Sequence, residues 1–174
     1  MDKDLQNFQR ETTSVWSFPE RGKWYTHRGN YPGNFPPQVP RNLILQYSRE
    51  GDIVLDPMMG GGTTMIETRI LNRRGIGFDI NPAALEISRK NLDFEGSFKY
   101  HPVLGLADAR DLRELKDETI DLIITHPPYL DIISYSEGQI KEDLSNIEDV
   151  DFFLREISKV ARENYRVLKK NKYC

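Results

Sequence analysis

Beyond residue 40, short continuous apolar runs alternate with segments in which apolar residues recur at helical spacing. The runs predict four strands that are buried on both faces, at residues 53–55, 76–80, 103–106 and 120–125. The other segments predict four helices, at residues 40–50, 63–74, 81–91 and 152–168. This alternation predicts an α/β fold with a doubly wound, mainly parallel sheet.

Residues 1–40 have a different character. Aromatic residues are interleaved there with glycines and five prolines, which is too aromatic for a disordered tail and too interrupted for a helix or a sheet. We expect an aromatic N-terminal wrap, residues 1–40, that packs on a core of residues 41–174 and partly lines a groove. Its mixture of aromatic and basic side chains also indicates contact with nucleic acid; they are Arg21, Lys23, Trp24, Tyr25 and Arg28.

The last six residues, 169–174, follow the final predicted helix and have the pattern of a turn and the first residues of another strand. A sheet that ended there would leave the fourth strand, residues 120–125, as an exposed edge. We therefore expect the sheet to be incomplete at the C-terminus and the core to be partial. The chain would then be a fragment or one half of a split enzyme.

The composition indicates one soluble globular domain, with 174 residues, 38% hydrophobic residues and a mean hydropathy of −0.60. No apolar run approaches the roughly 20 residues of a membrane helix, and the polar start at Met1 is unlike a secretory signal. We expect a cytoplasmic protein without a membrane partner. The single cysteine, Cys174, excludes a disulfide framework, and the three histidines are too scattered for a metal site.

A glycine-rich segment follows the first predicted strand and leads into a helix. Gly60, Gly61 and Gly62 allow a tight turn and close approach of a ligand to the backbone. A lysine of the kind that phosphate-binding loops place after their glycines is missing, and the spacing of the dinucleotide fingerprint is also absent. The segment therefore indicates a nucleotide-like cofactor other than a nucleoside triphosphate, although a purely structural glycine turn remains an alternative.

Acidic residues follow the next two predicted strands. Asp79 is placed to accept hydrogen bonds from the hydroxyls of a ribose, or else to cap the helix that begins at Pro82. Asp108, after the third strand, is placed to bind the amino group of the cofactor's adenine. Asp111 is a competing candidate, with the alternative that it caps a following helix.

The fourth predicted strand ends in His126, Pro127, Pro128 and Tyr129. An exocyclic amino nitrogen of a base is a poor nucleophile because its lone pair is delocalised into the ring, and hydrogen-bond acceptors around its protons localise that pair. Proline has no N–H, so the two prolines offer only carbonyl acceptors. Tyr129 can stack on the base, and a neutral imidazole at His126 can accept a hydrogen bond or the released proton.

In this order, the two segments resemble the S-adenosylmethionine-dependent amino-methyltransferases of DNA. The residues that match the family's glycine motif are Asp56, Pro57, Gly60, Gly62, Thr63 and Thr64. The resemblance implies that they hold the methionine part of S-adenosylmethionine, with S-adenosylhomocysteine as product. His126 is a departure, because the family usually has aspartate, asparagine or serine there, and this leaves cytosine N4 and adenine N6 both open as targets.

The resemblance implies methylation of an exocyclic amino group in DNA, in a restriction–modification system or elsewhere. One alternative is methylation of an RNA base or a glutamine side chain. Another is a non-catalytic, cofactor-binding half that a second polypeptide or a missing C-terminal part completes. Methylation of cytosine at carbon 5 is excluded, because it requires a cysteine nucleophile and the only cysteine is terminal.

Overall fold

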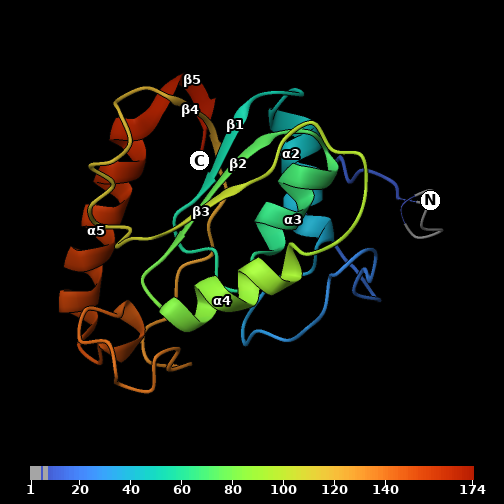
Figure 1. Cartoon of the computed structure of the whole chain (residues 1–174). Coiled ribbons are helices and arrows are strands. Elements are labelled where there is room, and N and C mark those ends of the chain that lie inside the picture. The colour runs from blue at the N-terminus through green and yellow to red at the C-terminus, as the bar shows by residue number, and fades with distance from the viewer. Residues whose placement is uncertain (1–4, 6–7) are drawn as a thin grey trace.

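The computed structural model describes residue 5 and residues 8–174, and its centre is a parallel sheet of five strands (Figure 1). In chain order, the strands are β1 (Ile53–Asp56), β2 (Arg74–Asp79), β3 (Val103–Leu106), β4 (Ile120–Ile123) and β5 (Leu168–Tyr173). Their order across the sheet is β3-β2-β1-β4-β5, and each neighbouring pair is parallel. The predicted α/β fold with a doubly wound parallel sheet is confirmed.

Helices cover both faces of this sheet (Figure 1). One face carries α2 (Gln38–Tyr47), α3 (Thr63–Ile70) and α4 (Pro82–Asn91), and the other carries α5 (Val150–Val167). The loop between β4 and α5 contains a short 3-10 helix, η1 (Leu144–Asn146).

Successive residues of a central strand pack on opposite faces of the sheet. Val54 of β1 packs with Ile44 of α2, whereas the next residue, Leu55, lies in a cluster with Val167 of α5. Alternation of side chains along a strand explains why a sheet covered on both faces has continuous apolar strands.

The N-terminal segment is held on the helices by a buried carboxylate. Glu67 of α3 is fully buried, and its Oε1 accepts a hydrogen bond of 2.6 Å from Nε1 of Trp24. The same oxygen lies 2.8 Å from Nε2 of His27, and Oε2 lies 2.8 Å from Nη1 of Arg41 in α2. Because Trp24 is only 2% exposed, the expectation that it contacts nucleic acid is wrong.

The end of α3 differs from the predicted helix over residues 63–74, which would end directly before Gly75. The helix ends at Ile70, Asn72 adopts a positive φ of 55°, and β2 begins at Arg74. Gly75 lies within β2, where a Cβ atom would be 2.3 Å from Oγ1 of Thr68. The glycine therefore permits close packing of α3 on the sheet and does not mark the helix end.

The C-terminal segment corrects the expectation that the fourth strand is an edge. Strand β5 pairs in parallel with β4, with a shift of register between Ile120 and Leu122, so β4 lies inside the sheet, between β1 and β5. Strand β5 lies at the edge of the sheet, and acidic side chains pair with its lysines. Nζ of Lys169 lies 2.9 Å from Oδ1 of Asp121, and Lys170 pairs with Glu118 at 3.4 Å.

Candidate active site

The glycine turn joins β1 to α3 and requires glycine at two positions. Gly60 has a φ of +51° and Gly62 a φ of +80°, in the left-handed region that disfavours side chains. A Cβ atom at Gly60 would lie 2.7 Å from Cε1 of Tyr31, and one at Gly62 would lie 2.9 Å from Oγ of Ser88. The turn is thus shaped by the tyrosine above it and by α4 beside it.

Asp79 ends β2 next to this turn. Its Oδ2 accepts a hydrogen bond of 2.9 Å from the N–H of Gly60, and its Oδ1 accepts one of 2.9 Å from the N–H of Asn81. Asn81, whose side chain accepts from the N–H of Ala83, is the residue that caps α4. Asp79 is therefore not itself the helix cap. Burial raises the pKa of the Asp79 carboxyl, and these two hydrogen bonds oppose that rise.

Asp56 ends β1 and is 2% exposed. The hydroxyl of Thr64 donates a hydrogen bond of 2.6 Å to its Oδ2, and the N–H of Met58 lies 3.2 Å from its Oδ1. Burial raises the pKa of Asp56 to about 7, more strongly than these hydrogen bonds lower it. Thr64 thus positions Asp56 beneath the turn.

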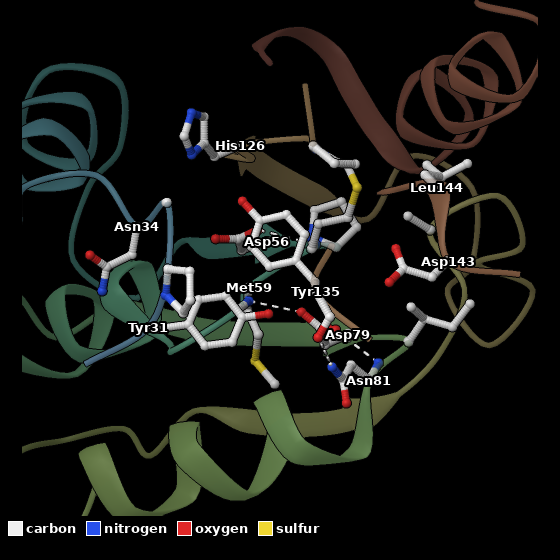
Figure 2. A pocket seen from close by; sticks show the side chains of 18 of the residues that line it. Tyr31, Asn34, Asp56, Met59, Asp79, Asn81, His126, Tyr135, Asp143 and Leu144 are labelled. Carbon is white, nitrogen blue, oxygen red and sulfur yellow. Dashed lines mark hydrogen bonds between the residues drawn. The ribbon is translucent and has the colours of Figure 1, made fainter. Parts of the chain in front are cut away.

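A pocket opens at the carboxyl ends of the strands, with about 790 Å³ of empty space when its open mouth is included (Figure 2). Ligands of open α/β sheets bind at this end. Eight of the twelve predicted site residues line it: Asp56, Pro57, Gly60, Thr63, Asp79, Asp108, His126 and Pro128. The other four, Gly62, Thr64, Pro127 and Tyr129, lie outside its lining.

Asp108 is held by an arginine. Nε of Arg110 lies 2.9 Å from Oδ1 of Asp108, and Nη2 lies 2.6 Å from Oδ2. Arg110 also pairs with Glu156 of α5 at 2.6 Å. Asp111, the competing candidate, is not part of the lining and pairs with Arg113. No helix lies between Asp111 and β4, because residues 111–119 form turns and irregular segments, so the alternative that Asp111 caps a helix is wrong.

His126 lies at the end of β4 against the N-terminal segment. Its ring centroid is 5.4 Å from that of Phe35, and its Nε2 is hydrogen-bonded with the hydroxyl of Tyr129. Burial lowers the pKa of His126, and a hydrogen bond with the backbone of Gly33 opposes this. The imidazole is therefore neutral at pH 7 and has one nitrogen that accepts hydrogen bonds. Tyr129 is 57% exposed, so its ring is accessible.

Two segments that lie far apart in the sequence supply other parts of the lining. Tyr31 and Phe35 come from the N-terminal segment, in accord with a wrap that lines a groove. Tyr135, Asp143 and Leu144 come from the loop between β4 and α5, and their place in the pocket was not predicted from the sequence. The rings of Tyr31 and Tyr135 lie 5.7 Å apart at an angle of 9° (Figure 2). Apart from the aromatic ring of Tyr135, the sequence carries no signal for these three residues.

Comparisons with known proteins follow the same motifs. The chain is 36% identical over 115 residues to a tRNA (guanine(10)-N2)-dimethyltransferase of Methanothermobacter thermautotrophicus. The aligned region covers 66% of this chain and 33% of that protein. It is also 40% identical over 83 residues to the type II methyltransferase M.HpaI of Haemophilus parainfluenzae. That alignment covers 48% of this chain and 26% of that protein. The chain thus spans about a third or less of the length of these relatives.

Solved structures share the fold. An S-adenosylmethionine-dependent methyltransferase from Methanosarcina mazei superimposes with a TM-score of 0.51 and 22% identity, over 73% of this chain and 52% of that chain. Residues 2–90 match the N6/N4 methyltransferase family, described as DNA methylase. The matched range includes the glycine turn and Asp79, whereas Asp108 and residues 126–129 lie outside it. The chain belongs to this family of N6/N4 DNA methylases.

Proposed function

We propose that this protein transfers a methyl group from S-adenosylmethionine to an exocyclic amino group in DNA, either N6 of adenine or N4 of cytosine. The observation that supports this most directly is that His126 and Pro128, from the end of β4, line the same pocket as Gly60 and Asp79. A base that enters beside His126 would meet the cofactor's methyl group in one pocket, and such positioning is the main contribution that an enzyme makes to this reaction.

The charge of the pocket supports this cofactor. The lining carries five carboxyl groups, and its described residues include no lysine or arginine; the acids are Asp56, Asp79, Asp108, Glu142 and Asp143. Arg110 pairs with Asp108 and the pKa of Asp56 is about 7, so the negative charge comes mainly from the other three. A negative lining repels phosphate groups and attracts a cation. S-adenosylmethionine carries a positively charged sulfonium that supplies the methyl group.

The lining is compatible with the roles predicted for its residues, each of which would bind a different part of the cofactor. The turn from Gly60 to Gly62 would hold the methionine part, because no Cβ atom obstructs it. Asp79 would accept from the ribose hydroxyls, since each of its oxygens accepts one hydrogen bond and can accept a second. Asp108 would accept from the adenine amino group in exchange for one of the hydrogen bonds that Arg110 donates to it. Family membership and the shared fold support the same cofactor.

The residues after β4 would act on the target base. The backbone carbonyls of Pro127 and Pro128 accept hydrogen bonds from its amino group and localise the nitrogen lone pair. His126 is neutral, and its accepting nitrogen would serve the same group, or the proton released after transfer, once the hydroxyl of Tyr129 leaves it. The exposed ring of Tyr129 stacks on the base once the base has left its duplex.

A second candidate substrate is an amino group of an RNA base. The relatives named tRNA (guanine(10)-N2)-dimethyltransferase match 66% and 69% of this chain, more of it than the 48% that M.HpaI matches. Guanine N2 is also an exocyclic amino nitrogen, so the carbonyls of Pro127 and Pro128 would serve it by the same chemistry.

We further propose that other parts of the protein, in the same or a second polypeptide, supply target recognition, and that the protein acts in the cytoplasm. The first proposal is supported by the lengths of the relatives, of which this chain spans about a third or less. No helix in the described part of the chain is long and apolar enough to cross a membrane. A chain that binds the cofactor but needs another part for turnover would be the cofactor-binding half of a split enzyme.

The test is transfer of a radiolabelled methyl group from S-adenosylmethionine to unmethylated duplex DNA, single-stranded DNA and unmodified tRNA. The 174-residue chain is assayed alone and with the remaining parts of the protein, and hydrolysed products are separated to identify the methylated base. Labelled N6-methyladenine or N4-methylcytosine supports the proposal. Label in tRNA alone supports the second candidate, and label in no nucleic acid from either form contradicts both.

A further inference from the structure

Asp143 lies in the loop between β4 and α5, directly before η1, and lines the cofactor pocket. The residue is 6% exposed. Its Oδ1 accepts a hydrogen bond of 2.9 Å from the N–H of Ser145, which fixes the side chain at the start of η1. Figure 2 shows the carboxylate turned towards Asp79 and Tyr135.

The second oxygen of this carboxylate, Oδ2, is buried without a hydrogen-bond partner among the described residues. A buried acceptor that lacks a partner destabilises the folded protein, and a charged acceptor does so most. Among the described residues that carry such an atom, Asp143 is the one that lines the pocket. It therefore has an unused capacity to accept a hydrogen bond from a ligand.

The loop that carries Asp143 is fixed to the part of the pocket near Asp108. Nη2 of Arg110 donates a hydrogen bond of 2.7 Å to the carbonyl of Glu142, while the same guanidinium pairs with Asp108. Leu144 is buried in a cluster with Ala109. These contacts hold Asp143 in place from both sides, so its free oxygen does not depend on the position of a mobile side chain.

The nearest functional groups identify the part of the ligand that it would meet. Asp143 and Asp79 line the same pocket, and the negative charge of Asp143 adds to burial in raising the pKa of Asp79. Asp79 and Asp108 are the residues proposed for the ribose and the adenine. A third acceptor beside them is suited to a neutral donor on the nucleoside, such as a hydroxyl or an amino group.

We propose that Oδ2 of Asp143 binds the nucleoside half of the cofactor, by accepting a hydrogen bond from a ribose hydroxyl or from the adenine amino group. This inference rests on the proposed function, because it takes the cofactor to be S-adenosylmethionine. It adds a binding residue from the loop after β4 to those at the ends of β1, β2 and β3.

The variant Asp143→Asn tests this proposal with little disturbance to the fold. The asparagine Oδ1 still accepts the hydrogen bond from the N–H of Ser145. The NH₂ group that replaces Oδ2 is itself a donor, so it cannot accept a hydrogen bond from a hydroxyl or an amino group of the ligand. We expect S-adenosylhomocysteine to bind Asp143→Asn about 10- to 100-fold more weakly than wild type, as for removal of one hydrogen bond to a charged group. The control is Glu148→Gln, which removes an exposed carboxylate from the same loop and should bind as wild type does.

Calorimetric titration with S-adenosylhomocysteine and thermal unfolding, both on the 174-residue chain, separate the outcomes. If the wild type does not bind, the proposed function fails. If the wild type and Asp143→Asn bind equally, only the role of Asp143 fails. Should the variant not fold, a crystal structure of the wild type with S-adenosylhomocysteine decides: a nitrogen or oxygen of the ligand within about 3.2 Å of Oδ2 supports the proposal, and none within that distance overturns it.

Cofactor analogues then identify the donor. Wild type and Asp143→Asn are titrated with S-adenosylhomocysteine that lacks the 2′-hydroxyl, lacks the 3′-hydroxyl or carries hypoxanthine in place of adenine. For each analogue, the loss of affinity is compared between wild type and Asp143→Asn. The group that Asp143 binds is the one whose removal weakens binding to wild type by a clearly larger factor than it weakens binding to the variant. Equal factors for all three analogues would overturn the proposed hydrogen bond.

Discussion

The main-chain N–H of Gly60 donates a hydrogen bond of 2.9 Å to Oδ2 of Asp79. This bond joins the turn after β1 to the end of the neighbouring strand β2, so the two elements proposed to hold the cofactor are fixed to one another without a ligand. A site that is already ordered loses less conformational entropy when it binds. The relationship also means that Asp79 has a structural role in addition to its proposed role in binding.

Substitution of Asp79 should weaken cofactor binding. We expect Asp79→Ala to bind S-adenosylhomocysteine with about 1–3 kcal/mol less free energy, because charge-assisted hydrogen bonds to the ribose are removed. Calorimetry measures this, and Glu86→Gln on the exposed face of α4 is the control. Since the variant also loses the acceptor for Gly60, its unfolding is measured alongside. Unchanged affinity would remove Asp79 from the site.

Gly62 should be intolerant of a side chain. In Gly62→Ala, a φ of +80° and a Cβ atom 2.9 Å from Oγ of Ser88 both oppose the native turn, and we expect a decrease of about 1–3 kcal/mol in the free energy of unfolding. Chemical denaturation measures it. Gly29→Ala is the matched control, because a Cβ atom there has no described neighbour within 4 Å and φ is not positive. Similar stability for both variants would contradict the prediction.

Asp56 should make stability depend on pH. Its pKa is raised by burial to about 7 in the folded state, whereas an unfolded chain releases this proton near pH 4. Between these values the folded state binds more protons, so the contribution of Asp56 to stability is present below about pH 4 and is lost as pH rises through about 7.

Asp56→Asn carries no such proton and should lack this part of the pH dependence. The difference in unfolding free energy between wild type and Asp56→Asn should therefore change by up to about 1.4 kcal/mol per pH unit between pH 4 and 7, and level off above that range. Urea denaturation at several pH values, compared with Asp111→Asn on the surface, measures the difference. A difference that is constant from pH 5 to 8 would show that the carboxyl is ionised throughout.

Lys23 and Arg28 test whether the N-terminal segment binds nucleic acid. Both residues are exposed, and replacement of both by glutamine should lower DNA affinity. The slope of log K against log salt should become shallower by about 0.9 for each DNA phosphate that the protein no longer neutralises. Cofactor binding should not change. The control is Lys170→Gln, on the exposed strand β5. An unchanged slope in the Lys23/Arg28 variant would show that the N-terminal segment has only a structural role.

His126 and Tyr129 can be separated by their substitutions. In the form of the protein that shows turnover, His126→Ala should lower the rate more than the cofactor affinity, because its proposed hydrogen bond is made to the target base. Tyr129→Ala should remove about 1–3 kcal/mol of stacking free energy between the ring and the target base, and so lower the rate. Tyr129→Phe keeps the ring and removes only the hydrogen bond with His126. Single-turnover methyl transfer measures each rate. Full activity of His126→Ala would exclude the residue from the mechanism.

Local sequence was sufficient for the parts of the site that depend on a single strand and the turn after it. The carboxyl ends of parallel strands meet at one edge of a sheet, so Asp56, Asp79, Asp108 and His126 could be assigned to one pocket once the strands had been recognised. The glycine turn was recognisable for a similar reason, since positive φ angles at Gly60 and Gly62 are a property of the backbone at those residues.

Tertiary structure alone decided which distant segments complete that pocket. Tyr31 and Tyr135 lie far apart in the sequence and become parallel neighbours only because the N-terminal segment and the loop after β4 line the same pocket. The pairing of β5 with β4 is also long-range, and the free oxygen of Asp143 follows from which groups the folded chain brings near it. Each depends on the packing of the folded chain, whereas hydrophobic periodicity and turn chemistry describe only residues that are close along the sequence.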